Sequence, residues 1–281
     1  MRPANIPLPY FDILLDRLSQ GDPMVRQAFG RHVHWGYWAN PAKADGSVED
    51  FAIATENLCQ RVYKTTNVKE YDRLLDVGCG FGGTIASLNE NFQNLDITGL
   101  NIDARQLDRA RREVCPSAYN KIAFVQGDAC QLPFADASMD IVLAVECIFH
   151  FPSREVFFQE VRRVLKPGGR FGISDFVATP VFKLFQQLLN KITDPLMSGT
   201  YGRVDSNFTL SDYRNLAQKT GLRLTTSEDI THETLPTYPV VKQIFEQADA
   251  AKAARDTDAV GKISQLGLLR YMILSFELQE D

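Results

Sequence analysis

The sequence predicts an α/β fold built on a doubly wound, mostly parallel sheet of seven strands. Three observations predict this class. Short apolar runs alternate with stretches of helical periodicity, glycines follow the first apolar run, and capping residues stand where helices should begin or end. Right-handed connections between parallel strands place helices on both faces of such a sheet. Ligands then bind at the carboxyl ends of its strands.

The expected strands are apolar runs at residues 73–77, 95–100, 122–125, 141–145, 170–174, 222–225 and 270–278. Helices are expected between the first strands of this series. One spans residues 84–92, Asp103 caps another, and Ser153 opens a third, which ends at Pro167 and the two glycines after it.

Two regions outside this alternation are expected to cover the ligand end of the sheet. Residues 1–70 form an N-terminal helical lid segment, and residues 71–281 form the main domain, with inserted apolar cap segments at 178–208 and 233–262. The lid segment contains the aromatic group HVHWGYW at 32–38. The first cap segment contains Phe182, Leu184, Phe185, Leu188 and Leu189, which suit a lid and an ordinary core equally well.

Charge and composition exclude several classes of protein. The chain has 30 basic and 35 acidic residues and no run of Lys or Arg, so a partner with a nucleic-acid backbone is not expected. No apolar run of about 18 residues predicts a membrane span. Five cysteines without CxxC spacing fit reduced thiols in the cytoplasm better than disulfides or zinc. The sequence contains no pattern that indicates the oligomeric state.

A glycine-rich loop follows the first strand, in the run DVGCGFGG at 76–83. Such a loop lets a nucleotide-like cofactor approach a helix N-terminus, but it does not say which cofactor. Asp76 discriminates between the candidates, because a carboxylate repels the pyrophosphate of a dinucleotide and attracts the amine and sulfonium of S-adenosylmethionine. Asp76 therefore favours S-adenosylmethionine over a nicotinamide cofactor.

Four segments, LLDVGCGFGG, TGLNID, QGDACQLPFADASMDIV and RRVLKPGG, resemble the successive motifs of class I S-adenosylmethionine-dependent methyltransferases, which have a Rossmann-like fold. The resemblance covers roughly half of the chain. It implies that Gly78, Gly80 and Gly82 contact the methionine portion, and that Asp128 and Ala129 flank the adenine.

The same resemblance assigns the ribose contact to the end of the second strand. The family usually has an acid there, whereas this chain has Asn101, whose amide can also bind hydroxyls. Ile102 and Gln106 are expected beside the cofactor as well. Asp103 is interpreted as the helix cap rather than a ribose ligand.

Methyl transfer to an alcohol needs alignment and a base for the hydroxyl proton. His150 follows the fourth strand, and Asp175 ends the fifth, so we expect the two to form a base and its orienting carboxylate. AVECIFHF and GISDFV resemble natural-product methyltransferases that act on sugar and polyketide hydroxyls, where a histidine in this loop is the proposed base. Packing or strand-end roles are the alternatives for His150 and Asp175.

The aromatic group at 32–38 resembles a segment that folds over the cofactor in the same subgroup. Trp35, Tyr37 and Trp38 are therefore expected to form a gate, with packing against the sheet as the alternative. We also expect Trp35 and Tyr37 to contact the cofactor, and Glu146 to position the cofactor or the substrate, with a purely structural role equally open for Glu146. No metal-binding cluster is evident, and no metal is expected.

The function expected from the sequence is methylation of a hydroxyl on a bulky apolar small molecule, such as a polyketide, a peptide-polyketide or a glycosylated product. Carbon methylation of a prenylated quinol or sterol, or nitrogen methylation, is the first alternative. A catalytically silent adenosylmethionine-binding protein is the second. The identity of the acceptor has no sequence signal.

Overall fold

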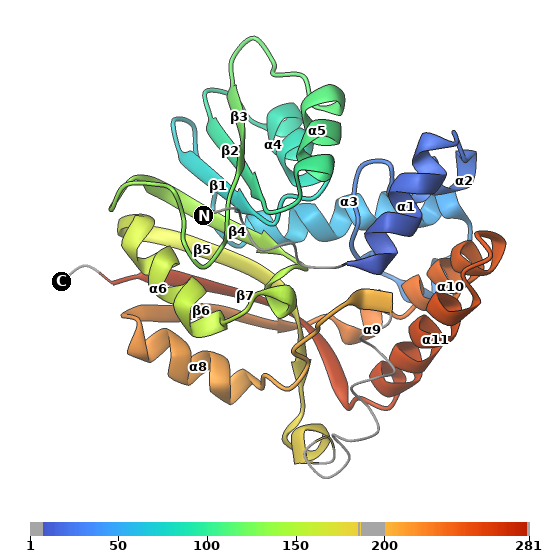
Figure 1. Cartoon of the computed structure of the whole chain (residues 1–281). Helices are drawn as coiled ribbons and strands as arrows, with labels where there is room; N and C mark the ends of the chain where they lie inside the picture. Colours follow the sequence, from blue (N-terminus) through green and yellow to red (C-terminus); the bar gives the residue numbers. More distant parts are fainter. Residues whose placement is uncertain (1–7, 185, 187–199, 280–281) are drawn as a thin grey trace.

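The computed structural model describes residues 8–184, 186 and 200–279, and in this part of the chain seven strands form one sheet in the order β3-β2-β1-β4-β5-β7-β6 (Figure 1). β7 runs antiparallel to both of its neighbours, and the other pairs are parallel. The predicted α/β class and the mostly parallel sheet are confirmed. The strands are β1 Arg73–Val77, β2 Asp96–Asn101, β3 Lys121–Gln126, β4 Met139–Val145, β5 Leu165–Ala178, β6 Leu222–Asp229 and β7 Leu269–Leu278.

Burial along the strands explains their positions in the sheet. β1 and β4 are buried almost throughout, as central strands covered on both faces must be. β3 and β6 consist mostly of partly buried and exposed positions, which suits the two edges of the sheet. The chain crosses from β1 to β2 on one side and later to β4 on the other, so the sheet has its switch point at β1.

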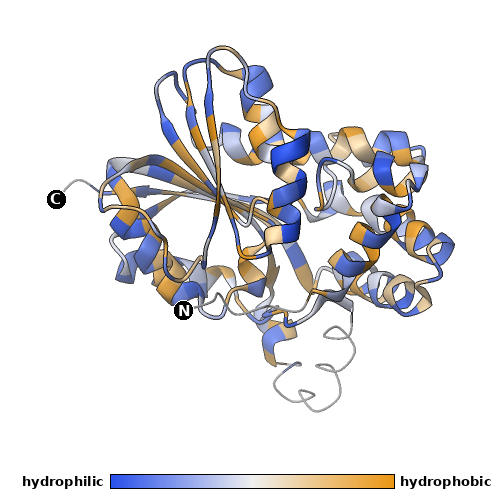
Figure 2. Cartoon of the chain, turned by 45° about the horizontal axis from the view of Figure 1, so that its top comes forward, coloured by the Kyte–Doolittle hydropathy of each residue, from blue (hydrophilic) through white to orange (hydrophobic). Residues whose placement is uncertain are grey.

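Helices cover both faces of the sheet and begin at the caps expected from the sequence. Asp103 accepts a hydrogen bond from the Arg105 amide (2.9 Å) and opens α5, and Ser153 accepts one from the Val156 amide (3.2 Å) and opens α6. Hydrophobic positions recur along these helices and along the strands (Figure 2), and their buried side chains form the cores between helices and sheet. The helices that flank the sheet are α3 Val48–Lys64, α4 Gly83–Asn91, α5 Ala104–Glu113, α6 Arg154–Val164 and α8 Leu210–Lys219.

A second group of helices lies beyond one end of the strands, on the right of Figure 1. It comprises α1 Pro9–Ser19, α2 Pro23–Phe29, α9 Thr231–Thr234, α10 Thr237–Gln247 and α11 Ala251–Gln265, and two short 3₁₀ turns, η1 Pro41–Lys43 and η2 Ile148–His150, complete the described elements. Leu14, Phe29, Phe51, Val241 and Ala254 share one core, which joins the N-terminal helices to α10 and α11. We call this assembly of α1, α2, α10 and α11 the cap.

The first of the two expected cap segments is described only in part. Phe182 is buried, whereas Leu184 is 59% exposed. Phe185, Leu188 and Leu189 lie outside the described residues. No helix in the described ranges combines the length and apolar character needed to cross a membrane.

Candidate active site

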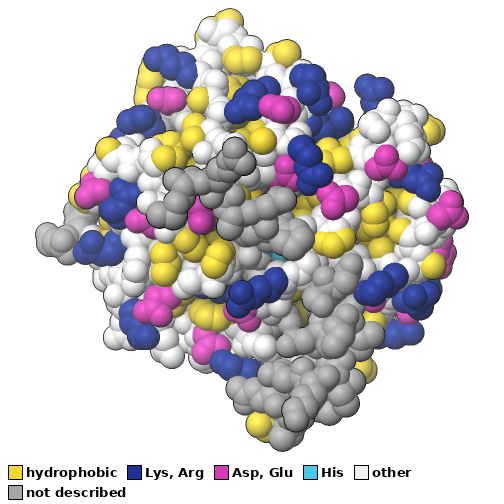
Figure 3. Space-filling view, in the orientation of Figure 1, with side chains coloured by type: hydrophobic (Ala, Val, Ile, Leu, Met, Phe, Trp, Pro, Cys, Tyr) yellow, Lys and Arg dark blue, Asp and Glu magenta, His cyan; other side chains and the backbone are white. Residues whose placement is uncertain are grey.

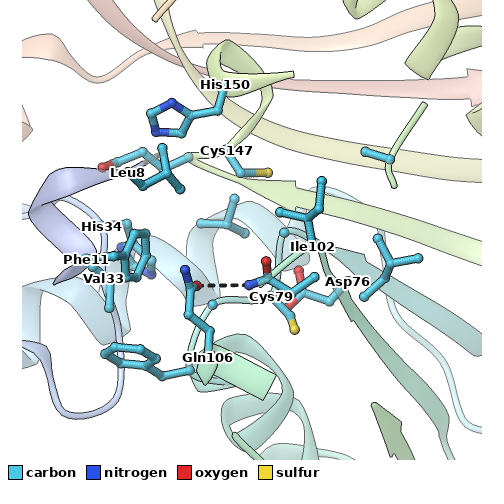
Figure 4. Close-up of a pocket in the computed structure, with 18 of the residues that line it drawn as sticks. Leu8, Phe11, Val33, His34, Asp76, Cys79, Ile102, Gln106, Cys147 and His150 are labelled. Carbon is cyan, nitrogen blue, oxygen red and sulfur yellow. Dashed lines mark hydrogen bonds between the residues drawn. The ribbon is translucent and has the colours of Figure 1, made fainter. Parts of the chain in front are cut away.

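An open cavity of about 900 Å³ lies at the carboxyl ends of β1, β2 and β4, at the switch point of the sheet. Leu8, Phe11 and Val33 lie on one side of it, and Asp76 and Ile102 on the other (Figure 4). We call it the glycine-loop cavity. Its wall contains all of the cofactor residues expected from the sequence except three, Gly82, Trp35 and Tyr37.

The glycine loop is shaped so that its backbone can face a ligand. Gly78 has φ +74°, and a Cβ there would lie 2.7 Å from the Cys147 Sγ, so neither the conformation nor the space admits a side chain. Gly80 has φ +54°, and the nearest atom to a Cβ would be the Gln106 Oε1 at 4.0 Å. Gly80 therefore presents its backbone to the open cavity, three residues before α4 begins at Gly83.

Asp76 is a buried carboxyl without a compensating partner. Its Oδ2 has no hydrogen bond, and burial raises the pKa of the carboxyl to about 8. Such a group is stabilised when a cation binds beside it. The amine and sulfonium of S-adenosylmethionine supply positive charge of this kind, so the residues present fit that cofactor.

The remaining cofactor residues in the wall of this cavity are polar or lie beside polar groups. The Asn101 Nδ2 donates a hydrogen bond to the Gln106 Oε1 (2.9 Å, dashed in Figure 4), which fixes both amides. Asp128 and Ala129 line the wall as well, and the Asp128 Oδ1 accepts a hydrogen bond from the Cys130 amide (2.8 Å). The interpretation of Asp103 as a helix cap is confirmed.

A second cavity, of about 680 Å³, opens from the first toward the cap. Its wall is predominantly apolar and aromatic, and includes Leu14, Phe29, Trp35, Phe176, Val241 and Leu269. We call it the apolar cavity. Tyr10, Val33, Glu146 and His150 line both cavities and mark their junction.

Glu146 adopts a strained conformation at this junction, with φ +50°. Its Oε2 accepts hydrogen bonds from the Trp35 amide (2.8 Å) and the Tyr271 hydroxyl. Burial raises the pKa of Glu146 to about 8, although these two donors oppose the shift. The carboxyl thereby ties the aromatic segment to the end of β4.

His150 presents one nitrogen to the junction. Its Nδ1 lies 3.2 Å from the Arg203 carbonyl oxygen, which can only accept, so Nδ1 carries the proton. The Nε2 is then the basic nitrogen, and it lies 3.5 Å from the Tyr10 hydroxyl oxygen. Burial lowers the pKa of His150 to about 4, so the imidazole is neutral at pH 7.

The expected pairing of His150 with Asp175 is wrong. Asp175 is fully buried and bonds to Arg154 (3.0 Å) and Tyr213. Side chains alternate along a strand, and Asp175 shares the face of Ile173, which packs against α6 and α8, away from the cap. A backbone carbonyl, that of Arg203, orients the imidazole instead.

The aromatic segment also differs from expectation. Tyr37 faces a surface groove, where the Arg61 guanidinium lies 4.7 Å from its ring, and it does not line the glycine-loop cavity. Trp35 lines the apolar cavity, and the Trp38 Nε1 donates a hydrogen bond to Asp50 (2.7 Å). Neither Tyr37 nor Trp35 is therefore placed to contact a ligand in the glycine-loop cavity.

Other residues of the N-terminal region line the glycine-loop cavity instead. Tyr10 and Phe11 of α1 do so, and so do His32 and His34. His34 Nε2 lies 3.1 Å from His32 Nδ1, and His32 Nε2 lies 2.8 Å from a Glu56 oxygen. His32 and His34 belong to the aromatic group at 32–38 that was expected to fold over the cofactor, whereas Tyr10 and Phe11 were not predicted, since the only signal for α1 was its apolar spacing.

The surface shows no preference for one charge on the face drawn in Figure 3, where acidic and basic side chains are interspersed. Within the described residues, no three His, Cys, Asp or Glu side chains are grouped to hold a metal ion.

These features together are typical of an α/β protein that binds a cationic nucleoside cofactor. They are a cavity at the switch point of the sheet, a glycine loop, a buried acid without a hydrogen bond on Oδ2, and polar side chains that can contact a nucleoside. A family model described as a methyltransferase domain matches residues 75–173. Methyltransferase GfsG of Streptomyces halstedii is 32% identical over 253 residues, covering 88% of this chain and 87% of that protein. The chain belongs to the class I S-adenosylmethionine-dependent methyltransferases of natural-product type, and S-adenosylmethionine is its cofactor.

Two further similarities extend the comparison. The 27-O-demethylrifamycin SV methyltransferase of Amycolatopsis mediterranei is 29% identical over 224 residues, 79% of this chain and 78% of that protein. The solved structure of the [4+2]-cyclase SpnF covers 99% of this chain and 100% of its own, with a TM-score of 0.73 at 21% identity, which shows the fold alone. Sterol 24-C-methyltransferases also match, over 41–59% of the chain.

Proposed function

We propose that this enzyme methylates a hydroxyl group of a bulky, largely apolar natural product, such as a polyketide, a peptide-polyketide or a glycosylated derivative, and that His150 removes the hydroxyl proton. One observation carries the proposal. The basic Nε2 of His150 lies at the junction between the cofactor-binding cavity and a cavity with a predominantly apolar and aromatic wall.

The apolar cavity supports an uncharged acceptor. Its described wall contains the neutral His150 and the carboxyl of Glu146, and no Lys or Arg. An acceptor with a phosphate or carboxylate group in this cavity would lack a cationic partner there, and desolvating such a group costs several kcal/mol. Burial of carbon-rich surface against the aromatic wall supplies the favourable free energy.

When bound, the cofactor supplies a methyl group already activated on sulfur. His150 Nε2 would accept the proton of the acceptor hydroxyl as the hydroxyl oxygen takes up that methyl group. A base with a pKa of about 4 is adequate, because the hydroxyl becomes strongly acidic as its oxygen gains the methyl carbon. Tyr10 and Val33, at the junction, exclude water from the reacting atoms.

Carbon methylation is the second candidate, favoured by the sterol 24-C-methyltransferase matches and by the apolar wall. An alkene acceptor has no hydroxyl proton, so His150 would contribute little until a proton leaves the carbocation. The methylated position in the product decides between the candidates. The fold of a [4+2]-cyclase also shows that this architecture alone does not establish methyl transfer.

The test is transfer of an isotope-labelled methyl group to a panel of neutral polyketide alcohols, sterols and amines, with the product's methyl position read by NMR. His150→Ala should lower the transfer rate by about two to four decades while the cofactor Kd stays within about twofold. His232→Ala, at an exposed histidine in α9, is the matched control and should change neither. If the label is found on an oxygen-bound methyl group and His150→Ala retains full activity, His150 is not the base.

A further inference from the structure

A buried arginine connects three elements behind the active site. The Arg154 side chain, at the start of α6, is 2% exposed. Its Nη2 donates to the Asp175 Oδ2 (3.0 Å) on β5, and its Nε donates to the Tyr213 hydroxyl (3.2 Å) on α8. Tyr213 in turn donates to Asp175. The position of the guanidinium is therefore set from three directions.

The same guanidinium also holds a segment outside the regular elements. Arg154 Nη1 donates to the Asp205 Oδ2 (2.5 Å), and Nη2 donates to the Asp205 carbonyl oxygen (2.8 Å). The Asp205 amide donates to the Phe149 carbonyl oxygen (2.9 Å). Asp205 is thus tied on one side to a rigid buried cation and on the other to the residue before His150.

The Arg203 carbonyl oxygen that accepts from His150 Nδ1 stands two residues before Asp205. Its position follows from the anchoring of Asp205, because two residues of chain leave little freedom. A displaced carbonyl would release the Nδ1 proton to either ring nitrogen, and a histidine with the proton on Nε2 cannot act as a base at the junction.

We propose that Arg154 is a positioning residue for His150, acting through the segment 203–205 to keep the imidazole proton on Nδ1. Asp175 and Tyr213 hold Arg154 in place, which assigns Asp175 an indirect part in catalysis. The inference rests on the proposed function in one respect, that His150 removes the acceptor's proton.

The free energy of burying an ion pair and the charge of Arg154 both favour a positioning role over simple packing. A buried ion pair contributes little net stability compared with apolar residues of the same size, so a structural role alone does not require one. Here the cation reaches out to Asp205, whose side chain is 49% exposed. The positive charge of Arg154 also adds to burial in lowering the pKa of His150, which keeps the imidazole neutral.

Asp205→Ala tests the inference without disturbing the buried Arg154–Asp175 pair. It removes the bond from Arg154 Nη1 and keeps the main-chain bonds of Asp205 to Arg154 and Phe149. The methyl-transfer kcat should fall by about tenfold, with the cofactor Kd and the acceptor KM within about twofold, because the segment is held less firmly while binding is retained. Asp205→Asn keeps an oxygen that accepts from Arg154 and should restore most of the rate. Asp136→Ala is the matched control: Asp136 is 79% exposed and pairs with another α6 arginine, Arg163 (2.8 Å).

Nitrogen-15 NMR of the imidazole supplies a readout that does not depend on activity. The wild-type His150 should show the proton on Nδ1, and Asp205→Ala should show a mixture of the two tautomers. In a His150→Ala background, Asp205→Ala should change the residual rate by less than about twofold, since the two act as one unit.

The outcomes separate the two proposals. Full activity of His150→Ala refutes the proposed base, whatever Asp205 does. A slow His150→Ala enzyme together with an unchanged tautomer in Asp205→Ala overturns the positioning inference alone. Equal rate losses from Asp205→Ala in both backgrounds overturn it as well.

Discussion

Replacing Asp76 by asparagine should weaken cofactor binding by an amount that grows with pH. The pKa of about 8 means that about nine in ten Asp76 carboxyls are protonated at pH 7 in the free enzyme. Pairing with the cofactor's amine requires the carboxylate. Binding must therefore release that proton, and the deprotonation of Asp76 costs about 1.4 kcal/mol of binding free energy for each pH unit below 8.

The magnitude follows from two opposed contributions. The charged hydrogen bond contributes about 1.5–3 kcal/mol, of which about 1.4 kcal/mol at pH 7 is offset by deprotonation. Asp76→Asn should thus bind about fourfold more weakly at pH 7 and about tenfold more weakly at pH 7.5, and it should equal the wild type between pH 6 and 7.

Calorimetry with S-adenosylhomocysteine, which carries the same amine, measures both affinity and proton release. In buffers of different ionisation enthalpy, the wild type should release about 0.9 proton at pH 7 and Asp76→Asn almost none. The partly exposed Asp96, paired with Arg73, provides the control Asp96→Asn, which should behave as wild type. Proton release that persists in Asp76→Asn but disappears in Glu146→Gln would refute the assignment, since the pKa of Glu146 is also about 8.

Three further predictions address the surroundings of the site. Tyr37→Ala should leave the cofactor Kd, measured by calorimetry, within about twofold of the wild type, because the Tyr37 ring faces a groove outside the cavity. A larger loss of affinity would show that Tyr37 contacts the cofactor after all. Asp12→Ala removes the ion pair between Asp12 of α1 and Arg105 (2.8 Å), so α1 should be held less firmly over the cavity. The cofactor's dissociation rate in stopped-flow measurements should rise by up to about fivefold. An unchanged rate would show that α1 does not retain the ligand. Glu56→Gln should flatten the pH dependence of the free energy of unfolding between pH 5 and 2, measured in urea. Burial raises the pKa of Glu56, but hydrogen bonds involving His32 and Ser87 outweigh it and lower the pKa to about 2, so the stabilisation is complete above about 4.5 and is lost as the pH falls; an equally steep loss in the variant would contradict this.

The fold was predictable because local and global signals agree in this chain. The central strands are continuous apolar runs, and Asp103 and Ser153 are good caps at helix starts, so propensity and pattern indicate the same elements. The glycine loop and the residues at the ends of β2 and β3 follow from the same order of elements. Most of the cofactor wall could therefore be placed from the sequence.

The catalytic geometry was less accessible for two physical reasons. β5 is buried on both faces, so no polar alternation shows that Asp175 faces α6 rather than the cap. The group that orients His150 is a backbone carbonyl, at Arg203, and any residue type supplies one. The position of Tyr37 was predicted wrongly because its neighbour Arg61 lies on α3, outside the aromatic segment, and contacts of that kind have no signature in a single sequence.

The cap joins helices from opposite ends of the chain, and this arrangement has a consequence for folding. Contacts between α1–α3 and α10–α11 close a loop of about 200 residues, so the entropic cost of forming them is met only after the sheet has brought the two regions together. The cap is then the last part to assemble and the first to detach. Detachment of the cap would open both cavities while the central strands remain paired. A ligand that binds only the closed form would make this detachment less frequent as the bound fraction of the protein rises.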